Sequence, residues 1–229
     1  MDFKFTTLET CPAATGVVVV IDVLRAFSAA AFAFAAGAQD IVLVSGINEA
    51  FTLKTQFPGA LLYGENHGLK VDGFDFGNSP SELSRQDLTG RRLIQRTSAG
   101  TQGVVRSAQA DRLLVSSFVV AEATVRYIRQ LAPPIVTFVV TGVIYERDGD
   151  EDMALAEYLQ ARLREQSPDP APYLARVPRS TSGRIFADPA QPEFPAADLE
   201  LCTQLDRFDF ALEVTRQTGL LVLNKKSQL

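Results

Sequence analysis

The feature that most constrains the fold is the unbroken run of β-branched residues from Val17 to Ile21, which Asp22 follows directly and Arg25 three residues later. Such a run is typical of a strand buried on both faces. The alanine-rich segment 26–36 has high helix propensity. In an open parallel sheet, ligands bind where strands end and helices begin. Asp22 and Arg25 are therefore the first candidate site residues. The structural alternative is that Asp22 caps the helix and Arg25 pairs with it.

Short β-rich runs recur along the chain, and helical patterns such as 47–54, 119–129 and 153–164 separate most of them. This alternation predicts an α/β fold with a mainly parallel sheet covered on both faces. A chain of 229 residues can form one such domain, and we expect a single domain over 1–229. The expected strands are 17–21, 41–44, 60–63, 92–95, 113–115, 135–140 and 220–223.

The stretch 167–197 differs from the rest of the chain because it holds seven of the twelve prolines. Proline removes a backbone donor and ends helices, so regular structure cannot extend far here. We expect a crossing loop or a lid over the site.

Charge and hydropathy exclude several classes of partner. The 22 basic and 27 acidic residues give a net charge of −5, without a basic cluster, so nucleic acid and anionic membranes are poor partners. The longest apolar stretch is too short to span a bilayer and the first residues do not resemble a signal peptide, so we expect a cytoplasmic protein. Cys11 and Cys202 lack metal-ligand spacing and are expected to be reduced. The oligomeric state stays open, with a homodimer allowed.

A second candidate segment is the loop around Asp75, which reads Gly-Phe-Asp-Phe-Gly-Asn-Ser-Pro over 73–80. Two glycines that bracket an acid indicate a sharply turned loop. Asp75 is a candidate ligand for a hard metal ion, and Asn78 is a candidate donor to an anion. Ser79 could donate as well, although capping a short helix that begins at Pro80 explains it better.

A third candidate segment runs from Arg96 to Thr101, directly after an expected strand. Its hydroxyls and backbone N–H groups could hold a phosphate or sulfonate, and an ordinary strand-to-helix turn fits equally well. The segment lacks the Gly-Lys-Ser/Thr ending of a P-loop, and no Gly-x-Gly-x-x-Gly follows a strand, so ATP and dinucleotides are not supported. The candidate anion-binding residues here are Arg96, Thr97, Ser98, Gly100 and Thr101.

A fourth candidate is the charged run 146–152, which follows the expected strand 135–140 and precedes a helix. Such a run is usually a solvated loop or an acidic first helical turn. Its position nevertheless makes Glu151 and Asp152 candidate oxygen ligands of Mg²⁺, together with Asp22 and Asp75. His67 is a candidate general acid, although a surface loop is the commoner setting for a lone histidine.

Taken together, these segments resemble the 2-phosphosulfolactate phosphatase family of Mg²⁺-dependent acid phosphatases. The resemblance implies a three-layer α/β/α sandwich that hydrolyses 2-phosphosulfolactate to 3-sulfolactate and phosphate, a step in coenzyme M synthesis. The matching segments are 21–26, Gly64-Glu65, 68–70, 73–80 with Glu82, 97–101, Ser117-Phe118 and Glu151-Asp152.

Three positions depart from the pattern that is common in that family, namely Asn66, Ala99 and Val120. An arginine is usual at the first and an asparagine at the other two. Because specificity depends on such polar contacts, the sulfonated substrate is less firmly implied than the phosphatase chemistry, and another small phosphorylated acid stays open.

The hypothesis that combines these observations is metal-assisted phosphoryl transfer to water. Asp22 with Asp75, Glu151 or Asp152 would hold Mg²⁺, while Arg25 and the segment 96–101 would hold the anion. The sequence leaves open whether Asp22 is itself the nucleophile. Haloacid-dehalogenase phosphatases need a second aspartate two positions on, where this chain has Leu24. A non-catalytic protein that binds a small anion, and an α/β domain whose polar turns are all caps, are the alternatives.

Overall fold

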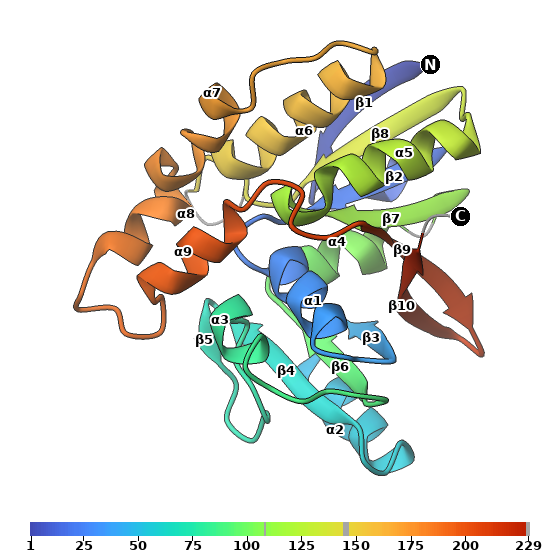
Figure 1. Cartoon of the computed structure of the whole chain (residues 1–229). Helices are drawn as coiled ribbons and strands as arrows, with labels where there is room; N and C mark the ends of the chain where they lie inside the picture. Colours follow the sequence, from blue (N-terminus) through green and yellow to red (C-terminus); the bar gives the residue numbers. More distant parts are fainter. Residues whose placement is uncertain (108, 144–146, 228–229) are drawn as a thin grey trace.

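The computed structural model describes residues 1–107, 109–143 and 147–227, and its centre is one ten-stranded sheet. The strand order is β1-β8-β2-β7-β9-β10-β3-β6-β4-β5 (Figure 1). The strands are β1 (Asp2–Thr7), β2 (Val17–Ile21), β3 (Asp40–Val44), β4 (Leu61–Asn66), β5 (Leu69–Lys70), β6 (Arg92–Arg96), β7 (Arg112–Ser116), β8 (Ile135–Val140), β9 (Phe210–Gln217) and β10 (Leu220–Ser227).

Helices connect most of these strands, as the alternating pattern predicts. The α-helices are α1 (Ala26–Ala35), α2 (Ile47–Gln56), α3 (Pro80–Leu83), α4 (Gly100–Arg106), α5 (Ala121–Leu131), α6 (Asp150–Leu163), α7 (Ala171–Leu174), α8 (Thr181–Arg184) and α9 (Ala196–Cys202). Short 3-10 helices are η1 (Cys11–Ala13), η2 (Phe118–Val120), η3 (Val177–Arg179) and η4 (Ile185–Ala187). None of the helices in the described part of the chain is long and apolar enough to cross a membrane.

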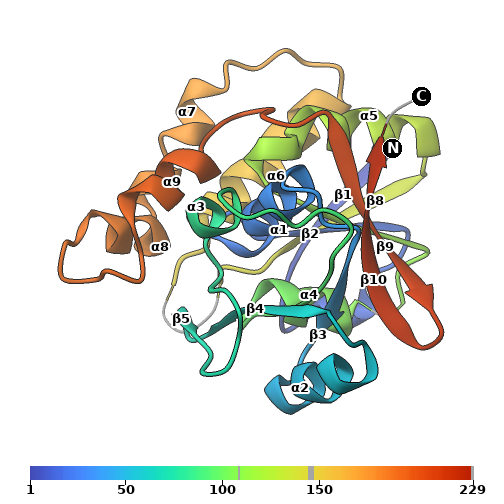
Figure 2. The ribbon, with the colours of Figure 1, turned by 60° about the horizontal axis from the view of Figure 1, so that its bottom comes forward.

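The sheet consists of two parallel groups of strands that an antiparallel hairpin joins. The first group is β1, β8, β2 and β7, and the second group is β3, β6 and β4. The hairpin β9–β10 pairs antiparallel with β7 on one side and with β3 on the other (Figure 2). Three antiparallel pairings thus separate the groups, so the second group runs opposite to the first along the sheet.

Helices cover both faces of the sheet, which confirms the predicted sandwich of helices, sheet and helices. On one face, α1 packs against side chains from both groups, including Val18 and Val20 of β2 and Ile41 and Leu43 of β3. On the other face, α5 and α6 cover the first group and α2 covers the second. Successive residues of β2 alternate between the two faces, and both faces are apolar, which explains its unbroken valine run.

The predicted strands are all present, and the structure adds three that the sequence analysis did not expect. β1 is an edge strand whose alternating pattern, Phe3 and Phe5 against Lys4, was considered only as a chain start. β9 contains the buried Glu213, whose carboxylate accepts a hydrogen bond from Arg112 Nε at 2.7 Å. The two-residue strand β5 pairs with the end of β4. A charged residue such as Glu213 interrupts the apolar pattern of a strand, so the strand is hard to predict before the ion-pair partner of that residue is known.

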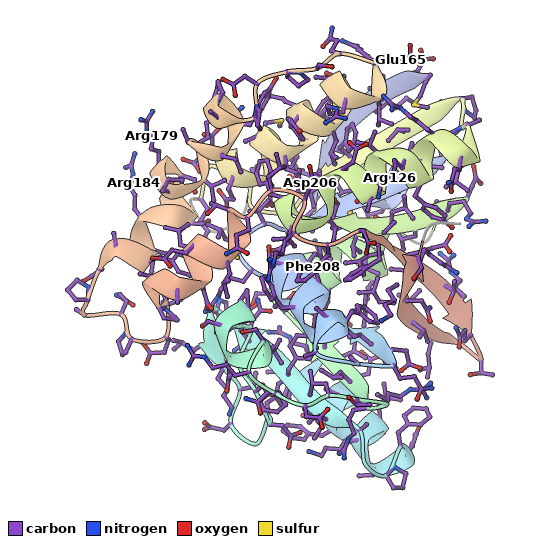
Figure 3. All side chains as sticks on the ribbon, in the orientation of Figure 1. Arg126, Glu165, Arg179, Arg184, Asp206 and Phe208 are labelled. Atoms are coloured by element: carbon purple, nitrogen blue, oxygen red, sulfur yellow. The ribbon has the colours of Figure 1, made fainter. Side chains whose placement is uncertain are left out.

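The proline-rich segment 167–197 forms short helical turns, α7, η3, α8 and η4, rather than a long regular element. Four of its residues, Ser182, Ile185, Phe186 and Phe194, line a cavity at the sheet edge, so the segment covers the site as a lid would. Figure 3 shows Arg179 and Arg184 at its outer edge, where both are exposed. The segment therefore contributes uncharged side chains to the cavity and exposes Arg179 and Arg184 to solvent.

Candidate active site

The site begins where β2 ends, at Asp22. This side chain is only 6% exposed, and the amide of Ala26 at the start of α1 donates to its Oδ1 at 3.0 Å. Asp22 therefore accepts from the first amide of the helix, as the structural alternative expected, but Arg25 pairs with Asp198 and not with Asp22. Among the described residues, hydrogen bonds reach only one oxygen of Asp22. Burial raises the pKa of Asp22 to about 6, opposed by the Ala26 amide and reinforced by the nearby carboxylates of Glu65 and Glu151. The buried carboxyl thus lacks a full set of partners for its charge.

Two further carboxylates come from the first turn of α6, which follows β8. Asp152 accepts hydrogen bonds from the Val23 amide and the Gly142 amide, each at 2.8 Å, so it ties the ends of β2 and β8 together. Burial and the charges of Glu151 and Asp22 raise its pKa well above the usual range. Glu151 is 2% exposed, and its Oε2 has no hydrogen-bond partner in the described structure. The rest of the charged run begins at Glu146, which lies outside the described residues.

The turn after β6 reaches the same place from the second group of strands. A Cβ added to Gly100 would lie 2.8 Å from Asp22 Oδ2 and 2.7 Å from Ala26 Cβ, so only glycine allows this approach. The Thr97 amide donates to Thr101 Oγ1 at 2.8 Å, and the Thr101 amide donates to Thr97 Oγ1 at 2.9 Å. Both hydroxyls are buried and stabilise the turn itself. Thr97 and Thr101 are thus not the free anion donors that the sequence analysis expected.

Arg96 and Ser98 form a second self-contained network, with Glu65 at its centre. Arg96 donates to the carbonyls of Ser45 and Glu65 at 3.2 and 2.7 Å, and it does not line the cavity. Glu65 accepts from Ser98 Oγ at 3.0 Å and from the Gly68 amide at 2.6 Å. Ser98 lines the cavity, whereas Arg96 only fixes the ends of the second group of strands.

Some candidate residues of the loop 73–82 line the cavity, and others only stabilise the loop. Asp75 does not line the cavity: its Oδ2 accepts from Lys54 Nζ and from the Leu62 amide, each at 2.7 Å. Burial acts against ionisation, but these hydrogen bonds outweigh it and lower the pKa of Asp75. The geometry therefore does not support the expected metal and catalytic roles of Asp75. Its ion pair with Lys54 fixes the base of the loop.

Asn78 and Ser79 lie at the other end of this loop. Asn78 is 6% exposed, lines the cavity, and its Oδ1 has no hydrogen-bond partner among the described residues. Ser79 caps α3, since its Oγ accepts from the Glu82 amide at 3.1 Å, which confirms the predicted cap. Asn78 is thus available to a ligand, whereas Ser79 supports the turn that holds it.

The cavity between these segments has a volume of about 160 Å³. Its walls include Asp22, Arg25, Glu65, His67 and Arg147. A smaller space of about 10 Å³ adjoins it and is lined by Asp22, Glu151 and Asp152 together with Arg147. The structure thus brings together Asp22, Arg25, Asn78, Ser98, Glu151 and Asp152, and leaves Asp75, Arg96, Thr97 and Thr101 outside the walls.

The small space fits a divalent ion in its size and in its donors. It holds about one water-sized sphere, and Mg²⁺ needs only one or two carboxylates because water and substrate complete its shell. Asp22 and the unpartnered Glu151 Oε2 provide these oxygens, whereas hydrogen bonds already occupy Asp152. The described residues form no cluster of three or more His, Cys, Asp or Glu side chains arranged to hold a metal ion. The fit is thus to a site with two carboxylates.

Several residues at the site escaped the sequence analysis. Glu65 was named only as part of a segment that matches the family, and Arg147 was included only as part of a charged run. Phe186, Phe194 and Asp198 come from the proline-rich segment and α9, where no motif marks them. Asp198 is 173 positions from Arg25, to which it is hydrogen bonded, so only the folded chain shows their relation.

The departures at 66, 99 and 120 differ in their consequences. Val120 is fully buried in the core beside α1, and the Oδ1 of Asn66 accepts a hydrogen bond from Arg96. Only Ala99 lines the cavity. Of the three departures, only Ala99 is therefore placed to alter the choice of substrate.

Comparison with known proteins shows the family of the chain. The model of the 2-phosphosulpholactate phosphatase family matches residues 5–217. A probable 2-phosphosulfolactate phosphatase of Bacillus subtilis is 35% identical over 202 residues, which cover 88% of this chain and 87% of the relative. A protein of the same description from Carboxydothermus hydrogenoformans is 37% identical over 224 residues, with 90% and 89% covered. Because the family model matches most of the chain and both relatives are at least 35% identical over nearly their whole length, the chain belongs to the 2-phosphosulfolactate phosphatase family.

Proposed function

We propose that this protein hydrolyses the phosphate ester of 2-phosphosulfolactate to 3-sulfolactate and inorganic phosphate, with Mg²⁺ as its metal. The observation that carries the proposal is the pair of buried carboxylates, Asp22 and Glu151, which face a space of ionic size beside the cavity. The non-catalytic binding protein considered from the sequence is not favoured by the family relationship. We also propose a cytoplasmic location, which suits the free thiols of Cys11 and Cys202.

In this proposal, Asp22 and Glu151 hold the metal ion, and Asp152 keeps the ends of β2 and β8 at a fixed separation. The bound metal would neutralise the phosphate and lower the pKa of a water molecule. Arg147, whose charge favours the ionised form of Asp22, lies at the same end of the cavity and balances the negative charge of the phosphoryl group.

The reaction breaks the bond between phosphorus and the ester oxygen, while the oxygen of a water molecule forms a new bond to phosphorus. The leaving alkoxide must take up a proton. His67 is at the cavity wall on the loop that follows β4, and we assign it this donation. Ser98 lines the same wall, but its hydroxyl donates to Glu65, so we assign Ser98 to holding that wall in place.

The test is phosphate release from 2-phosphosulfolactate by the wild-type protein with Mg²⁺ and with EDTA. We expect turnover only with the metal, and we expect Asp22→Asn to abolish it. Asp75→Asn is the matched control, because it makes the same change of carboxylate to amide outside the cavity walls. Metal-dependent turnover that survives in Asp22→Asn, or its absence in the wild type, would overturn the proposal.

A further inference from the structure

Three neighbouring spaces share wall residues in a row, which gives the site two distinct ends. The small space beside Glu151 shares Asp22 and Arg147 with the main cavity. A third space of about 190 Å³ shares Arg25 and Asn78 with the main cavity. Of these three spaces, Arg147 lines the small space and the main cavity, whereas Arg25 lines the main cavity and the third space. The two arginines therefore mark opposite ends, and Arg25 belongs to the end away from the carboxylate pair.

Arg25 is held rigidly although it lies in a cavity wall. Its Nη1 donates to Asp198 Oδ2 at 2.7 Å and to the Glu193 carbonyl at 2.9 Å, and its Nη2 donates to the Gly68 carbonyl at 3.2 Å. Its Cζ lies 4.9 and 5.4 Å from the ring centres of Phe194 and Phe186. These contacts use three of the five N–H donors of a guanidinium. The Nε–H and one N–H of Nη2 have no partner in the described part of the chain, so a ligand can receive them.

Asp198 connects this guanidinium to the loop on the facing wall. Its side chain is 0% exposed, its Oδ2 bonds Arg25, and its Oδ1 accepts from Ser79 Oγ at 2.8 Å and from the Ser81 amide at 2.9 Å. The turn that Asp198 fixes directly follows Asn78. A single buried carboxylate thus determines where Arg25 and Asn78, the two polar groups at this end, lie relative to each other.

We infer that Asp198 is a positioning residue that sets the guanidinium of Arg25 and the amide NH₂ of Asn78 to donate to the carboxylate or sulfonate of the substrate, away from its phosphate. The inference rests on the proposed function for the identity of the substrate. The planar guanidinium suits this role because it can donate two parallel hydrogen bonds to one anionic group. Asp198 acts through these groups and does not itself reach the ligand.

The test measures binding of two probes, 3-sulfolactate and inorganic phosphate, by calorimetry in the presence of Mg²⁺. In Asp198→Asn, an amide nitrogen can face Arg25, so the orientation of the guanidinium is lost. We expect binding of 3-sulfolactate to weaken about tenfold or more, while binding of phosphate changes less than about twofold. Asp188→Asn, the same change at an exposed position of the neighbouring proline-rich segment, is the control and should leave both affinities unchanged.

Two further measurements separate positioning from a general loss of structure. With 2-phosphosulfolactate, Asp198→Asn should raise KM much more than it lowers kcat. Arg25→Lys keeps the charge but removes the planar donor pair, so it should weaken the binding of 3-sulfolactate more than the binding of phosphate. This variant serves as the test if Asp198→Asn does not fold. Combining both changes should weaken binding little beyond Arg25→Lys alone.

Equal 3-sulfolactate affinities in the wild type and the variant that folds would overturn the inference, as would equal weakening of both probes. No measurable binding of 3-sulfolactate to the wild type would overturn it as well. Failure of the proposed function has a different signature, because it appears as absent phosphate release by the wild type whatever the binding results.

Discussion

The two parallel groups of strands contribute to the site in opposite ways. The first group ends in Asp22, Glu151 and Asp152, which are buried close together. Among the described residues, Glu151 Oε2 has no hydrogen-bond partner, and Asp22 accepts a side-chain hydrogen bond at one oxygen only. The second group ends in residues that satisfy one another, such as Thr97 with Thr101 and Glu65 with Ser98. Because buried polar atoms are normally paired, unpaired ones that line the cavities point to function. Tyr63 and Gln95 in the second group also have an unpaired side-chain oxygen among the described residues, but neither residue lines the cavity or the small space beside it. The first group therefore supplies the chemistry, and the second supplies a rigid wall.

The largest effect should come from the first group. Asp22→Asn removes a charged oxygen from the proposed metal site, so we expect kcat to fall at least about 10²-fold at saturating Mg²⁺. Asp75→Asn should reduce kcat less than about threefold, because a salt bridge at the loop base contributes little to chemistry. Steady-state phosphate release measures both. A similar fall in kcat in both variants would contradict the assignment of Asp22 as a reactive carboxylate and Asp75 as a structural one.

The pH dependence of stability should also distinguish the groups. Asp22 has a pKa of about 6 in the folded protein, above its ordinary 3.8, so its contribution to stability is complete below about pH 4 and is lost as pH rises through 6. Without metal, the free energy of unfolding of the wild type relative to Asp22→Asn should fall by about 2–3 kcal/mol over this range. Mg²⁺ should restore it at pH 7, since the ion binds the charged form. Urea titrations with EDTA or Mg²⁺ measure this, and a flat difference would contradict it.

The contact between the groups can be tested at Gly100. In Gly100→Ala, the new methyl group would lie within 2.8 Å of Asp22 Oδ2 and Ala26 Cβ, so the turn must shift. We expect a loss of about 1–3 kcal/mol in the free energy of unfolding and weaker Mg²⁺ binding. Gly90→Ala is the control, because a Cβ there meets nothing within 4 Å, although its positive φ adds some strain to that variant. Unchanged Mg²⁺ affinity in Gly100→Ala would mean that the second group does not support the metal site.

The structural role of the second group predicts a smaller effect at Thr101. Thr101→Val removes the hydroxyl that exchanges hydrogen bonds with Thr97, so unfolding should become easier by about 1–2 kcal/mol. The kcat of the folded protein should stay within about twofold, because this hydroxyl does not line the cavity. Denaturant titration and phosphate release measure the two quantities separately. A large fall in kcat with unchanged stability would show that the hydroxyl binds substrate after all.

The smallest effect concerns Ala99, the family departure that lines the cavity. Ala99→Asn adds an amide beside Asp22 and Ser182, so the ratio of kcat/KM for 2-phosphosulfolactate to that for p-nitrophenyl phosphate should rise about two- to tenfold. Val120→Asn is an unsuitable comparison because Val120 is fully buried. Asn66→Arg serves as the control, because Asn66 is only partly buried and does not line the cavity. An unchanged ratio would show that Ala99 does not influence selectivity.

The positions of the site segments were predictable because each follows a strand with a clear apolar pattern. Their roles were less predictable. The hydroxyl-rich turn 97–101 has the composition of an anion site, yet its hydroxyls bond to the turn itself. Asp75 sits in the most specific motif of the chain, yet Lys54 neutralises it. Composition shows which groups are present, but it does not show which of them already have partners.

The curvature of the sheet could not be predicted either. The expected single edge of parallel carboxyl ends is instead formed by two groups that run in opposite directions. Five steps separate β2 from β6, and the twist per step is about 20–25°, so the strands cross and their carboxyl ends can converge. The hairpin β9–β10, which makes this possible, was expected only as one strand near the C-terminal end.

The sequence alone determined the α/β class, most strand positions, the absence of long regular structure in the proline-rich segment and the family, since these depend on local periodicity and on residues adjacent in the chain. Only the tertiary structure decided which polar groups remain without partners, which arginine lies at which end of the cavity, and that Asp198 holds Arg25. The physical reason is that partnership and burial depend on contacts that join separate segments, up to 173 positions apart for Arg25 and Asp198, and no local pattern records them.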